Sequence, residues 1–438
     1  MTLESSYSQH IHSLQQGYEK VLDASPFDAV ILHSGCGLRQ RQCDDQYWPT
    51  KINPSFSHWA PLTQSRVMVV VRPGKKPMLI TPKADSFWEG KPKVESSHFW
   101  GEFERVDCTL DSVVSHLPTA KVAWIGDDIE SANRFGIPAE AHNPPALLAA
   151  IEALRVLKSE YEVSCLREAS RIATIGHAKT TELFLSGNHS ELELHLAYLA
   201  VTGQDATDTP YSNIVALGEN AAILHHVLYG RVSDERESTS MLVDAGATYM
   251  GYASDITRTV VRGTSQAALD FAALIEGMNS LELAICEQVK PGLPYEELHN
   301  LSHQALALLL LDSEICQGDA SELVDRGVTR AFFPHGLGHS LGLQVHDVGC
   351  RLTQPSDENP FLRNTSTIAE GQVFTVEPGC YFIDGLLGPL KNTSAGELVS
   401  WSTVDALRPF GGIRIEDNLL VTANTCENLT RDNWPKQQ

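Results

Sequence analysis

Residues 333–347 have the sequence Phe333-Pro334-His335-Gly336-Leu337-Gly338-His339-Ser340-Leu341-Gly342-Leu343-Gln344-Val345-His346-Asp347. Its three histidines, His335, His339 and His346, fall within twelve residues, and glycines are interspersed among them. Glycine lets a backbone approach a bound group closely because it has no side chain. We therefore expect this segment to line a site and to contribute histidine side chains to it.

Acidic residues end or interrupt strand-like apolar runs on both sides of this segment. They are Asp244 after Met241–Val243, Asp255 within Tyr252–Thr257, Glu377 after Val373–Val376, and Glu416 after Ile413–Ile415. A buried carboxylate without a partner costs several kcal/mol, so such positions need cations or strong donors. Because side chains alternate along a strand, Arg414 and Glu416 are expected on one face, and Asp244 and Asp255 are expected to meet across a hairpin.

One histidine and four carboxylates together indicate a dinuclear metal site. Their summed charge is about −4, which two divalent cations neutralise. An oxygen-rich ligand set suits Mn²⁺, and Co²⁺ or Zn²⁺ would also bind by the usual affinity order. Each residue alone has an ordinary explanation, such as a cap for Asp244 or an ion pair between Glu416 and Arg414. Their joint occurrence favours the metal site.

The second half of the chain mixes long helices with short strands. Periodicity predicts strands at 211–217, 241–247, 251–262, 373–382 and 412–421, and helices at 191–202, 265–289 and 294–311. The segments 351–372 and 384–412 are rich in Pro, Asn, Ser and Gly and are predicted to be long loops with at most short helices.

The first half has the alternating pattern of an α/β domain. Strands are predicted at 29–32, 67–71, 77–80 and 121–125, and helices at 9–23, 109–117 and 129–134. Pro144-Pro145 interrupts the chain, and Ser159 with Glu162 has the form of a capping box that opens a helix to about Leu185. The sequence therefore predicts an α/β domain at residues 1–155 and a second domain at residues 156–438.

Composition excludes several classes of protein. The 438 residues are too many for one small module, and 55 acidic against 33 basic residues give a net charge of −22, which argues against nucleic acid and anionic membranes as partners. The nine cysteines are scattered and form no CxxC pair, so neither a disulfide framework nor a zinc ribbon is indicated. No apolar run has the length of a signal peptide core or a membrane span. A soluble cytoplasmic protein is expected.

The order and context of these motifs resemble those of the metal-dependent pita-bread peptidases, and within them the Xaa-Pro dipeptidases, or prolidases. The resemblance covers essentially the whole chain and is nearest to the marine bacterial branch whose members were named organophosphorus acid anhydrolases. It implies an α+β pita-bread catalytic domain with a curved, mainly antiparallel sheet. It also implies that two metals are held by Asp244, Asp255, His339, Glu377 and Glu416, with Asp255 and Glu416 contacting both.

The same resemblance implies roles for residues that bind the substrate. His225 and His346 match the family's pair of substrate-facing histidines, His335 and Arg414 match the pocket for the product proline carboxylate, and Tyr211 matches a pocket tyrosine of the marine branch. The segment Cys43–Trp48 resembles a loop that reaches the active site of a partner subunit, with Asp45 facing the substrate amine, so a homodimer is expected. His226 departs from the family, which usually has Tyr there.

The implied reaction is hydrolysis of Xaa-Pro dipeptides to a free amino acid and proline. Two metals lower the pKa of a shared water, Glu377 acts as general base and proton shuttle, and His346 or His225 steadies the oxyanion. A carboxylate clamp at Arg414 would restrict the enzyme to dipeptides, and organophosphorus triesters are expected as a side activity. The alternatives are an Xaa-Pro aminopeptidase that acts on longer peptides and a non-catalytic pita-bread binding protein.

Overall fold

The structure is a computed structural model that describes residues 2–42, 46–83 and 98–435. The chain divides into two compact units, Met1–Cys165 and Leu166–Gln438. The domain boundary expected from sequence, at 155/156, lies before this division and close to the start of the helix α5 (Glu160–Ser186). The predicted capping box is present at that start, because Ser159 N donates to Glu162 Oε2 at 2.8 Å and Glu162 N to Ser159 Oγ at 3.4 Å.

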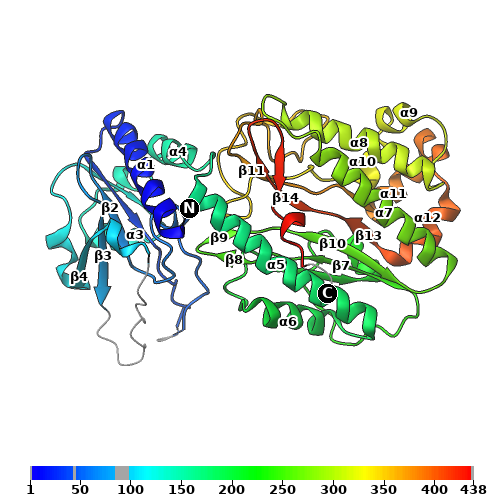
Figure 1. The fold of residues 1–438 in the computed structure, drawn as a ribbon, viewed down its shortest axis with the longest axis horizontal. Helices are drawn as coiled ribbons and strands as arrows, with labels where there is room; N and C mark the ends of the chain where they lie inside the picture. The colour runs from blue at the N-terminus through cyan, green and yellow to red at the C-terminus, as the bar shows by residue number, and fades with distance from the viewer. Residues whose placement is uncertain (1, 43–45, 84–97, 436–438) are drawn as a thin grey trace. The chain divides into compact units, whose positions relative to one another are not determined.

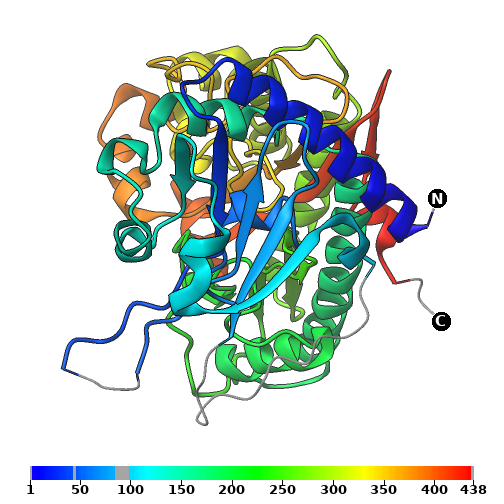
Figure 2. The same ribbon diagram turned by 90° about the vertical axis from the view of Figure 1, so that its left-hand side faces the viewer.

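The first unit contains a five-stranded mixed sheet in the order β4-β3-β2-β1-β5 (Figure 2). Its strands are β1 (Ala29–His33), β2 (Met68–Val71), β3 (Met78–Lys83), β4 (Glu104–Thr109) and β5 (Val122–Ile125). The pairs β1–β5 and β3–β4 are parallel, and the others are antiparallel. Four strands lie where the apolar runs predicted them. The edge strand β4 was not predicted, because most of its side chains are polar and exposed.

The helices of the first unit are α1 (Leu3–Asp23), α2 (Pro54–Ser57), α3 (Ile129–Arg134) and α4 (Pro145–Ala153). Helix α1 buries Tyr7, Ile11, Leu14, Tyr18 and Leu22, and it packs beside α4 (Figure 1). The helix expected at 109–117 is a 3-10 helix, Leu110–His116, and two further 3-10 turns lie at Trp100–Glu102 and Ala139–Ala141.

All strand pairs of the second unit are antiparallel within the described residues, as expected for a mainly antiparallel sheet. One sheet has the order β10-β7-β6 and another the order β11-β14-β15, while β12 pairs with β13 and β8 with β9. The strands are β6 (Ile214–Leu217), β7 (Thr239–Asp244), β8 (Thr248–Tyr249), β9 (Tyr252–Ala253), β10 (Thr257–Arg262), β11 (Val373–Val376), β12 (Gly379–Tyr381), β13 (Gly412–Arg414), β14 (Asp417–Val421) and β15 (Cys426–Asn428).

Helices cover these sheets from outside (Figure 1). They are α5, α6 (Glu191–Thr202), α7 (Gln266–Cys286), α8 (Tyr295–Asp312), α9 (Ala320–Asp325), α10 (Val328–Phe332), α11 (Asp384–Lys391) and α12 (Trp401–Leu407). Helices α5 and α6 pack Phe184 and Tyr198 against Met241 of the sheet β10-β7-β6. Helices α7 and α8 share a hydrophobic core with Phe374 and Val376 of β11. Among the described residues, no helix is both long and apolar enough to cross a membrane.

Three strands expected to be continuous are each broken in two. The segment 251–262 forms β9 and β10, 373–382 forms β11 and β12, and 412–421 forms β13 and β14. Asp255, Glu377 and Glu416 lie at the three breaks, between the paired halves. The apolar alternation continues across each break, which is why the sequence predicted one strand. The breaks free these acidic residues from regular strand pairing at the place where a site is expected.

Candidate metal centre

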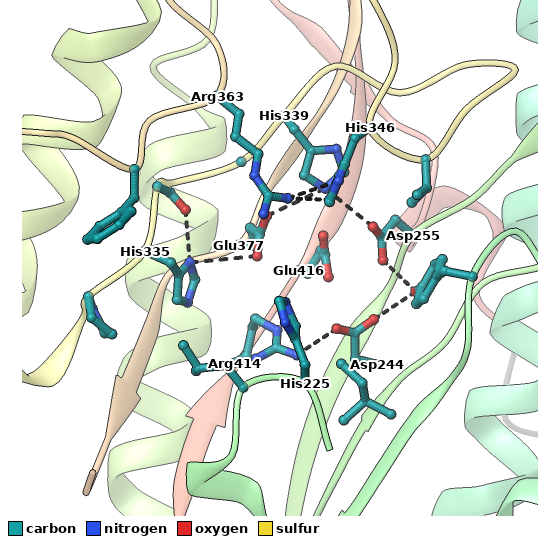
Figure 3. Close-up of a pocket in the computed structure, with 18 of the residues that line it drawn as sticks. His225, Asp244, Asp255, His335, His339, His346, Arg363, Glu377, Arg414 and Glu416 are labelled. Carbon is teal, nitrogen blue, oxygen red and sulfur yellow. Dashed lines mark hydrogen bonds and ion pairs between the residues drawn. The ribbon is translucent and has the colours of Figure 1, made fainter. Parts of the chain in front are cut away.

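A cavity of about 860 Å³ in the second unit gathers most of the residues that the sequence singled out (Figure 3). Its lining includes all five expected metal ligands, Asp244, Asp255, His339, Glu377 and Glu416, together with Tyr211, His225, His335, His346 and Arg414. Asp45 lies outside the described residues. His226 is not part of the lining.

His339 lies between two of the carboxylates. Its Nε2 is 3.3 Å from Asp255 Oδ2 and 3.6 Å from Glu377 Oε1. Asp255, His339 and Glu416 each offer a ligand atom, and these atoms lie within 4.8 Å of one another. A nitrogen and several carboxylate oxygens at this spacing fit a divalent cation of the Mn²⁺ or Zn²⁺ kind.

The glycine-rich segment places His339 by running beside β11. Thr375 N donates to His339 O at 2.9 Å, and Glu377 N donates to Leu337 O at 2.8 Å. A Cβ atom at Gly338 would lie only 2.2 Å from Thr375 O and 2.5 Å from the Tyr295 hydroxyl oxygen. Only glycine fits at this position, so the glycine expected to allow close approach does so against the strand that carries Glu377.

Glu416 is held by Thr257 at the start of β10. Glu416 N donates to Thr257 O at 3.1 Å, and the Thr257 hydroxyl donates to Glu416 Oε2 at 2.7 Å. Asp244 ends the neighbouring strand β7 in register with Thr257. Carboxylates from the end of β7, the β9–β10 break and the β13–β14 break thus come together at one point.

Tyr211 joins Asp244 and Asp255. Its hydroxyl lies 2.7 Å from Asp244 Oδ1 and 2.5 Å from Asp255 Oδ1. The resemblance implied a pocket tyrosine, and Tyr211 does line the cavity. Its hydroxyl is directed at two expected metal ligands.

Burial and mutual repulsion control the charges of the cluster. Burial, and then the neighbouring carboxylates, raise the pKa values of Asp255, Glu377 and Glu416 well above the usual range. Burial lowers the pKa of His339 to about 4, so its imidazole is neutral at pH 7. Such groups become a ligand set when a cation displaces the carboxyl protons. The residues present therefore fit a divalent metal centre.

Arg414 is buried at the edge of the cluster with its nitrogens engaged. Nη2 donates to Asp244 Oδ2 at 2.6 Å, Nη1 to the Tyr381 hydroxyl at 2.9 Å, and Nε to Thr257 Oγ1 at 3.2 Å. The Tyr381 hydroxyl is also 2.8 Å from His335 Nε2, so it connects Arg414 to His335. Sequence reasoning missed Tyr381, because a tyrosine in a buried strand gives no functional signal.

His346 and His225 lie at the accessible side of the cavity, where both are exposed. The His346 ring centroid is 4.2 Å from that of His339, at a steep interplanar angle of 74°. The guanidinium of Arg363 contacts the His346 ring (Figure 3). Sequence reasoning missed Arg363, because a single exposed arginine in a loop rich in Pro, Asn and Ser gives no signal.

His226 is directed away from the cavity to Glu191 at the start of α6. His226 Nε2 is 2.8 Å from Glu191 Oε2, and the Glu191 carboxylate also accepts from Leu217 N at 2.9 Å and Gly230 N at 2.7 Å. This buried carboxylate therefore ties down both ends of the loop that carries His225. The structure gives His226 a part in shaping that loop.

Comparison with known proteins agrees with this architecture. The model of the family described as "Metallopeptidase family M24" matches residues 164–423. The model described as "Xaa-Pro dipeptidase, N-terminal domain" matches residues 5–152. The chain is 41% identical to Xaa-Pro dipeptidases of Pseudoalteromonas atlantica and Pseudoalteromonas haloplanktis, over 98% and 97% of its length and 98% of each relative.

Solved structures show the same fold at lower identity. Aminopeptidase P from Escherichia coli with the inhibitor Pro-Leu superposes with a TM-score of 0.72 at 22% identity, over all of this chain and 96% of that one. Aminopeptidase PepP of Pseudomonas aeruginosa gives a TM-score of 0.73 at 22% identity, over 99% of this chain and 96% of that one. The expected two-domain pita-bread architecture is confirmed. The chain belongs to metallopeptidase family M24 and, within it, to the Xaa-Pro dipeptidases.

Proposed function

We propose that the protein hydrolyses Xaa-Pro dipeptides to a free amino acid and proline, using two divalent cations, with Mn²⁺ the preferred ion. Asp244, Asp255, His339, Glu377 and Glu416 would hold the cations. The observation that carries the proposal is the convergence of four carboxylates and one imidazole on one cavity. The identity of 41% to Xaa-Pro dipeptidases over nearly the whole chain supports the same substrate class.

The scissile bond is a tertiary amide, whose proline nitrogen has no N–H to hold. When bound, the cations supply a hydroxide from water and polarise the carbonyl group. Glu377 takes the water proton and returns it to the leaving proline nitrogen. Its raised pKa and a side chain that is 16% exposed support this role, because a proton shuttle must reach the substrate and hold a proton in turn.

His346 and His225 would steady the oxyanion that develops on the scissile carbonyl. What supports this is their place on the accessible wall of the cavity, with His346 in ring contact with the proposed ligand His339. A neutral imidazole N–H placed there can donate to developing negative charge.

The terminal carboxylate of the substrate would bind near His335 and Arg414. Arg414 already bonds Asp244, Tyr381 and Thr257, which limits the donors that it can offer. Arg363 lines the same cavity, is exposed and contacts His346. We therefore add Arg363 as a carboxylate-binding side chain, because its guanidinium fork suits a carboxylate.

Three further expectations belong to this proposal. Organophosphorus triesters are a proposed side activity, because they need the same hydroxide and the cavity has apolar walls that include Ile214, Leu224 and Phe361. A homodimer is proposed in which Asp45 of one subunit faces the substrate amine in the other. A cytoplasmic location stays a prediction from the cysteine pattern.

The test is hydrolysis of Leu-Pro and Leu-Pro-Gly by chelator-stripped protein, with and without added Mn²⁺. The proposal expects cleavage of the dipeptide alone, restored by metal and lost in Glu377→Gln. The variant Arg363→Met should raise the KM for Leu-Pro and leave Mn²⁺ binding unchanged. Cleavage of both peptides would instead assign an Xaa-Pro aminopeptidase. Failure to cleave either peptide in the metal-loaded protein would leave a binding protein.

A further inference from the structure

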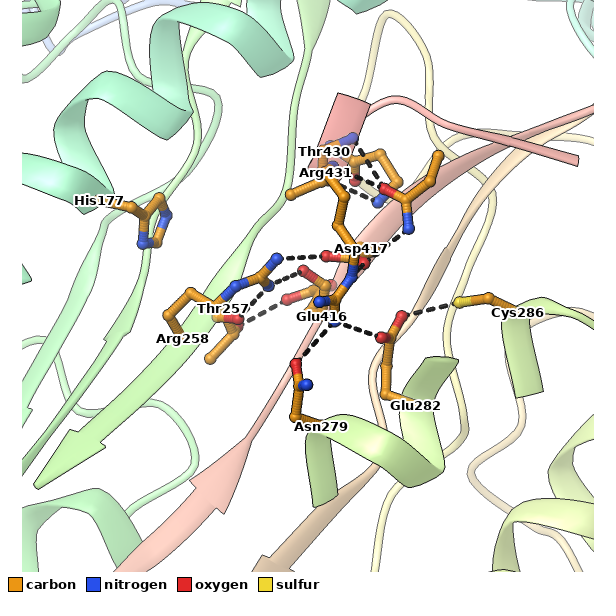
Figure 4. A network of polar contacts seen from close by, with 12 residues as sticks. His177, Thr257, Arg258, Asn279, Glu282, Cys286, Glu416, Asp417, Thr430 and Arg431 are labelled. Carbon is orange, nitrogen blue, oxygen red and sulfur yellow. Dashed lines mark hydrogen bonds and ion pairs between the residues drawn. The ribbon is translucent and has the colours of Figure 1, made fainter. Parts of the chain in front are cut away.

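Behind the metal centre, a second buried carboxylate is surrounded by cations of the protein itself (Figure 4). Asp417 directly follows Glu416, and its side chain is 0% exposed. It accepts from Arg258 Nη2 at 2.6 Å, from Asn428 Nδ2 at 2.7 Å and from Arg431 Nε. Arg431 also bonds Glu282 of α7 at 2.6 Å. We call these residues the Asp417 network.

Arg258 connects this network to the proposed metal ligand. While its Nη2 bonds the Asp417 carboxylate, its Nη1 donates to Glu416 O at 2.8 Å and to Thr257 O at 2.8 Å. One planar guanidinium thus holds the main chain of Glu416 and the side chain of Asp417 in a fixed relation. The guanidinium also lies 4.9 Å from the Trp434 ring centroid, which restricts it further.

Glu416 needs such support because of its position in the fold. It lies at the break between β13 and β14, where its backbone makes an isolated bridge to Thr257. Glu416 is 1% exposed, and the carboxylates of Asp255 and Asp244 repel its carboxylate. A ligand placed against repulsion at a strand break keeps its geometry only if its backbone is held from behind.

We propose that Arg258 is a positioning residue of the metal centre: by joining Glu416 O to the Asp417 carboxylate, it fixes the backbone from which Glu416 reaches the cations and so sets metal affinity. The inference rests on the proposed function, in which Glu416 is a ligand. Arg258 itself does not line the cavity.

The same strand offers a matched control. Arg262 lies four residues further along β10, on the same face of the strand. It too bonds main-chain oxygens, with Nη1 donating to Phe184 O at 3.1 Å and Nη2 to Asp234 O at 2.7 Å, and it lies 5.0 Å from the Phe184 ring centroid. Its partners are not part of the cavity lining. Loss of Arg262 therefore removes a comparable structural arginine without touching Glu416.

The experiment is titration of chelator-stripped full-length protein with Mn²⁺, with free Mn²⁺ measured by electron paramagnetic resonance. Wild type, Arg258→Met, Arg258→Lys, Arg262→Met and Glu416→Gln are compared, and urea unfolding of the metal-free forms measures stability separately. Arg258→Met should weaken binding at least about tenfold, the range found for outer residues that orient metal ligands. Arg262→Met should bind as wild type even if it is equally destabilised. Co²⁺ absorption bands should shift in Arg258→Met and not in Arg262→Met.

Arg258→Lys separates geometry from charge. One ammonium cannot reproduce the planar fork, so binding should stay weakened, and restoration to the wild-type value would overturn the proposal. Should Arg258→Met not fold, the comparison of Arg258→Lys with Arg262→Met decides alone. If Glu416→Gln loses no affinity, the proposed metal site is wrong. If Glu416→Gln loses affinity and both Arg258 variants do not, only the positioning role is wrong.

Discussion

Glu416 and Asp417 are consecutive, equally buried carboxylic acids with opposite electrostatics. Burial raises the pKa of Glu416, and Asp255 and Asp244 raise it further. Burial also acts to raise the pKa of Asp417, but Arg258 and Arg431 outweigh it and leave that pKa below its usual value. Burial is therefore not what distinguishes them. The sign of the shift follows the charges that the protein places around each group.

The two regions around these residues differ in the same way. On the cavity side, Asp244, Asp255, Glu377 and Glu416 share one buried arginine, Arg414 (Figure 3). On the other side, Asp417 and Glu282 share Arg258 and Arg431 (Figure 4). Arginines of the protein offset the charge of Asp417, whereas the proposed function expects cations from outside to complete the cavity cluster. In the proposed arrangement, Glu416 holds the cations and Asp417 holds the arginine that positions it.

The largest expected effect is the loss of catalysis when Glu416 is replaced. Glu416→Gln should lower Mn²⁺-dependent kcat/KM on Leu-Pro about a thousandfold, because bound cations contribute several kcal/mol and about 1.4 kcal/mol corresponds to a factor of ten. The metal-free variant should unfold at the same urea concentration as wild type or a higher one, because the neutral amide replaces a carboxyl group whose ionised form Asp244 and Asp255 repel. A metal-free variant that unfolds much earlier would show that Glu416 is structural.

Replacement of Asp417 should chiefly lower the stability of the protein. Asp417→Asn leaves Arg258 and Arg431 facing a neutral amide in a buried site, which should lower the free energy of unfolding by about 3 to 5 kcal/mol. Urea unfolding monitored by circular dichroism measures this loss, which should already appear in the metal-free protein. A loss confined to the metal-loaded form would contradict the division between the two residues.

The pH dependence of metal binding tests the raised pKa values of the cavity carboxylates. The raised pKa values of Asp255, Glu377 and Glu416 mean that the metal-free site holds protons that a cation must displace. Mn²⁺ affinity should therefore rise with pH, about tenfold per pH unit for each proton released, which calorimetry at a series of pH values above the ordinary carboxyl range can measure. A pH-independent affinity would contradict the raised pKa values.

The same raised pKa values predict the direction in which the stability of the metal-free protein changes with pH. Because the native state holds these protons more tightly than the unfolded chain does, the unfolding free energy of the metal-free protein should fall as pH rises through this range. Glu416→Gln should make that fall shallower, since one of the titrating groups is gone. Asp417, whose pKa is lowered, has already lost its proton and contributes no slope there.

The sequence predicted those parts of the site that carry a local signal. Asp244, Asp255 and Glu377 stand out because acidic residues at the ends of apolar strands are unusual, and the glycines around His339 indicate close backbone approach. The breaks at Glu377 and Glu416 were not predictable, because apolar alternation continues through them and only the assembled sheets show where pairing ends.

Residues whose partners are distant in sequence gave no signal at all. Arg258 and Asp417 meet across 159 positions, and Arg431 and Glu282 across 149. An isolated arginine is ordinarily a surface charge, so neither arginine could be assigned from sequence. His226 illustrates the same limit: the sequence marked it as unusual, and only the fold shows its bond to Glu191.

Gly338 sets a limit on how this centre can be re-engineered. Position 338 has no room for even one methyl group against Thr375 and Tyr295. Any residue other than glycine would push the His339 segment off β11 and shift the His339 imidazole without altering it. Selection for activity on new substrates should therefore leave this position unchanged.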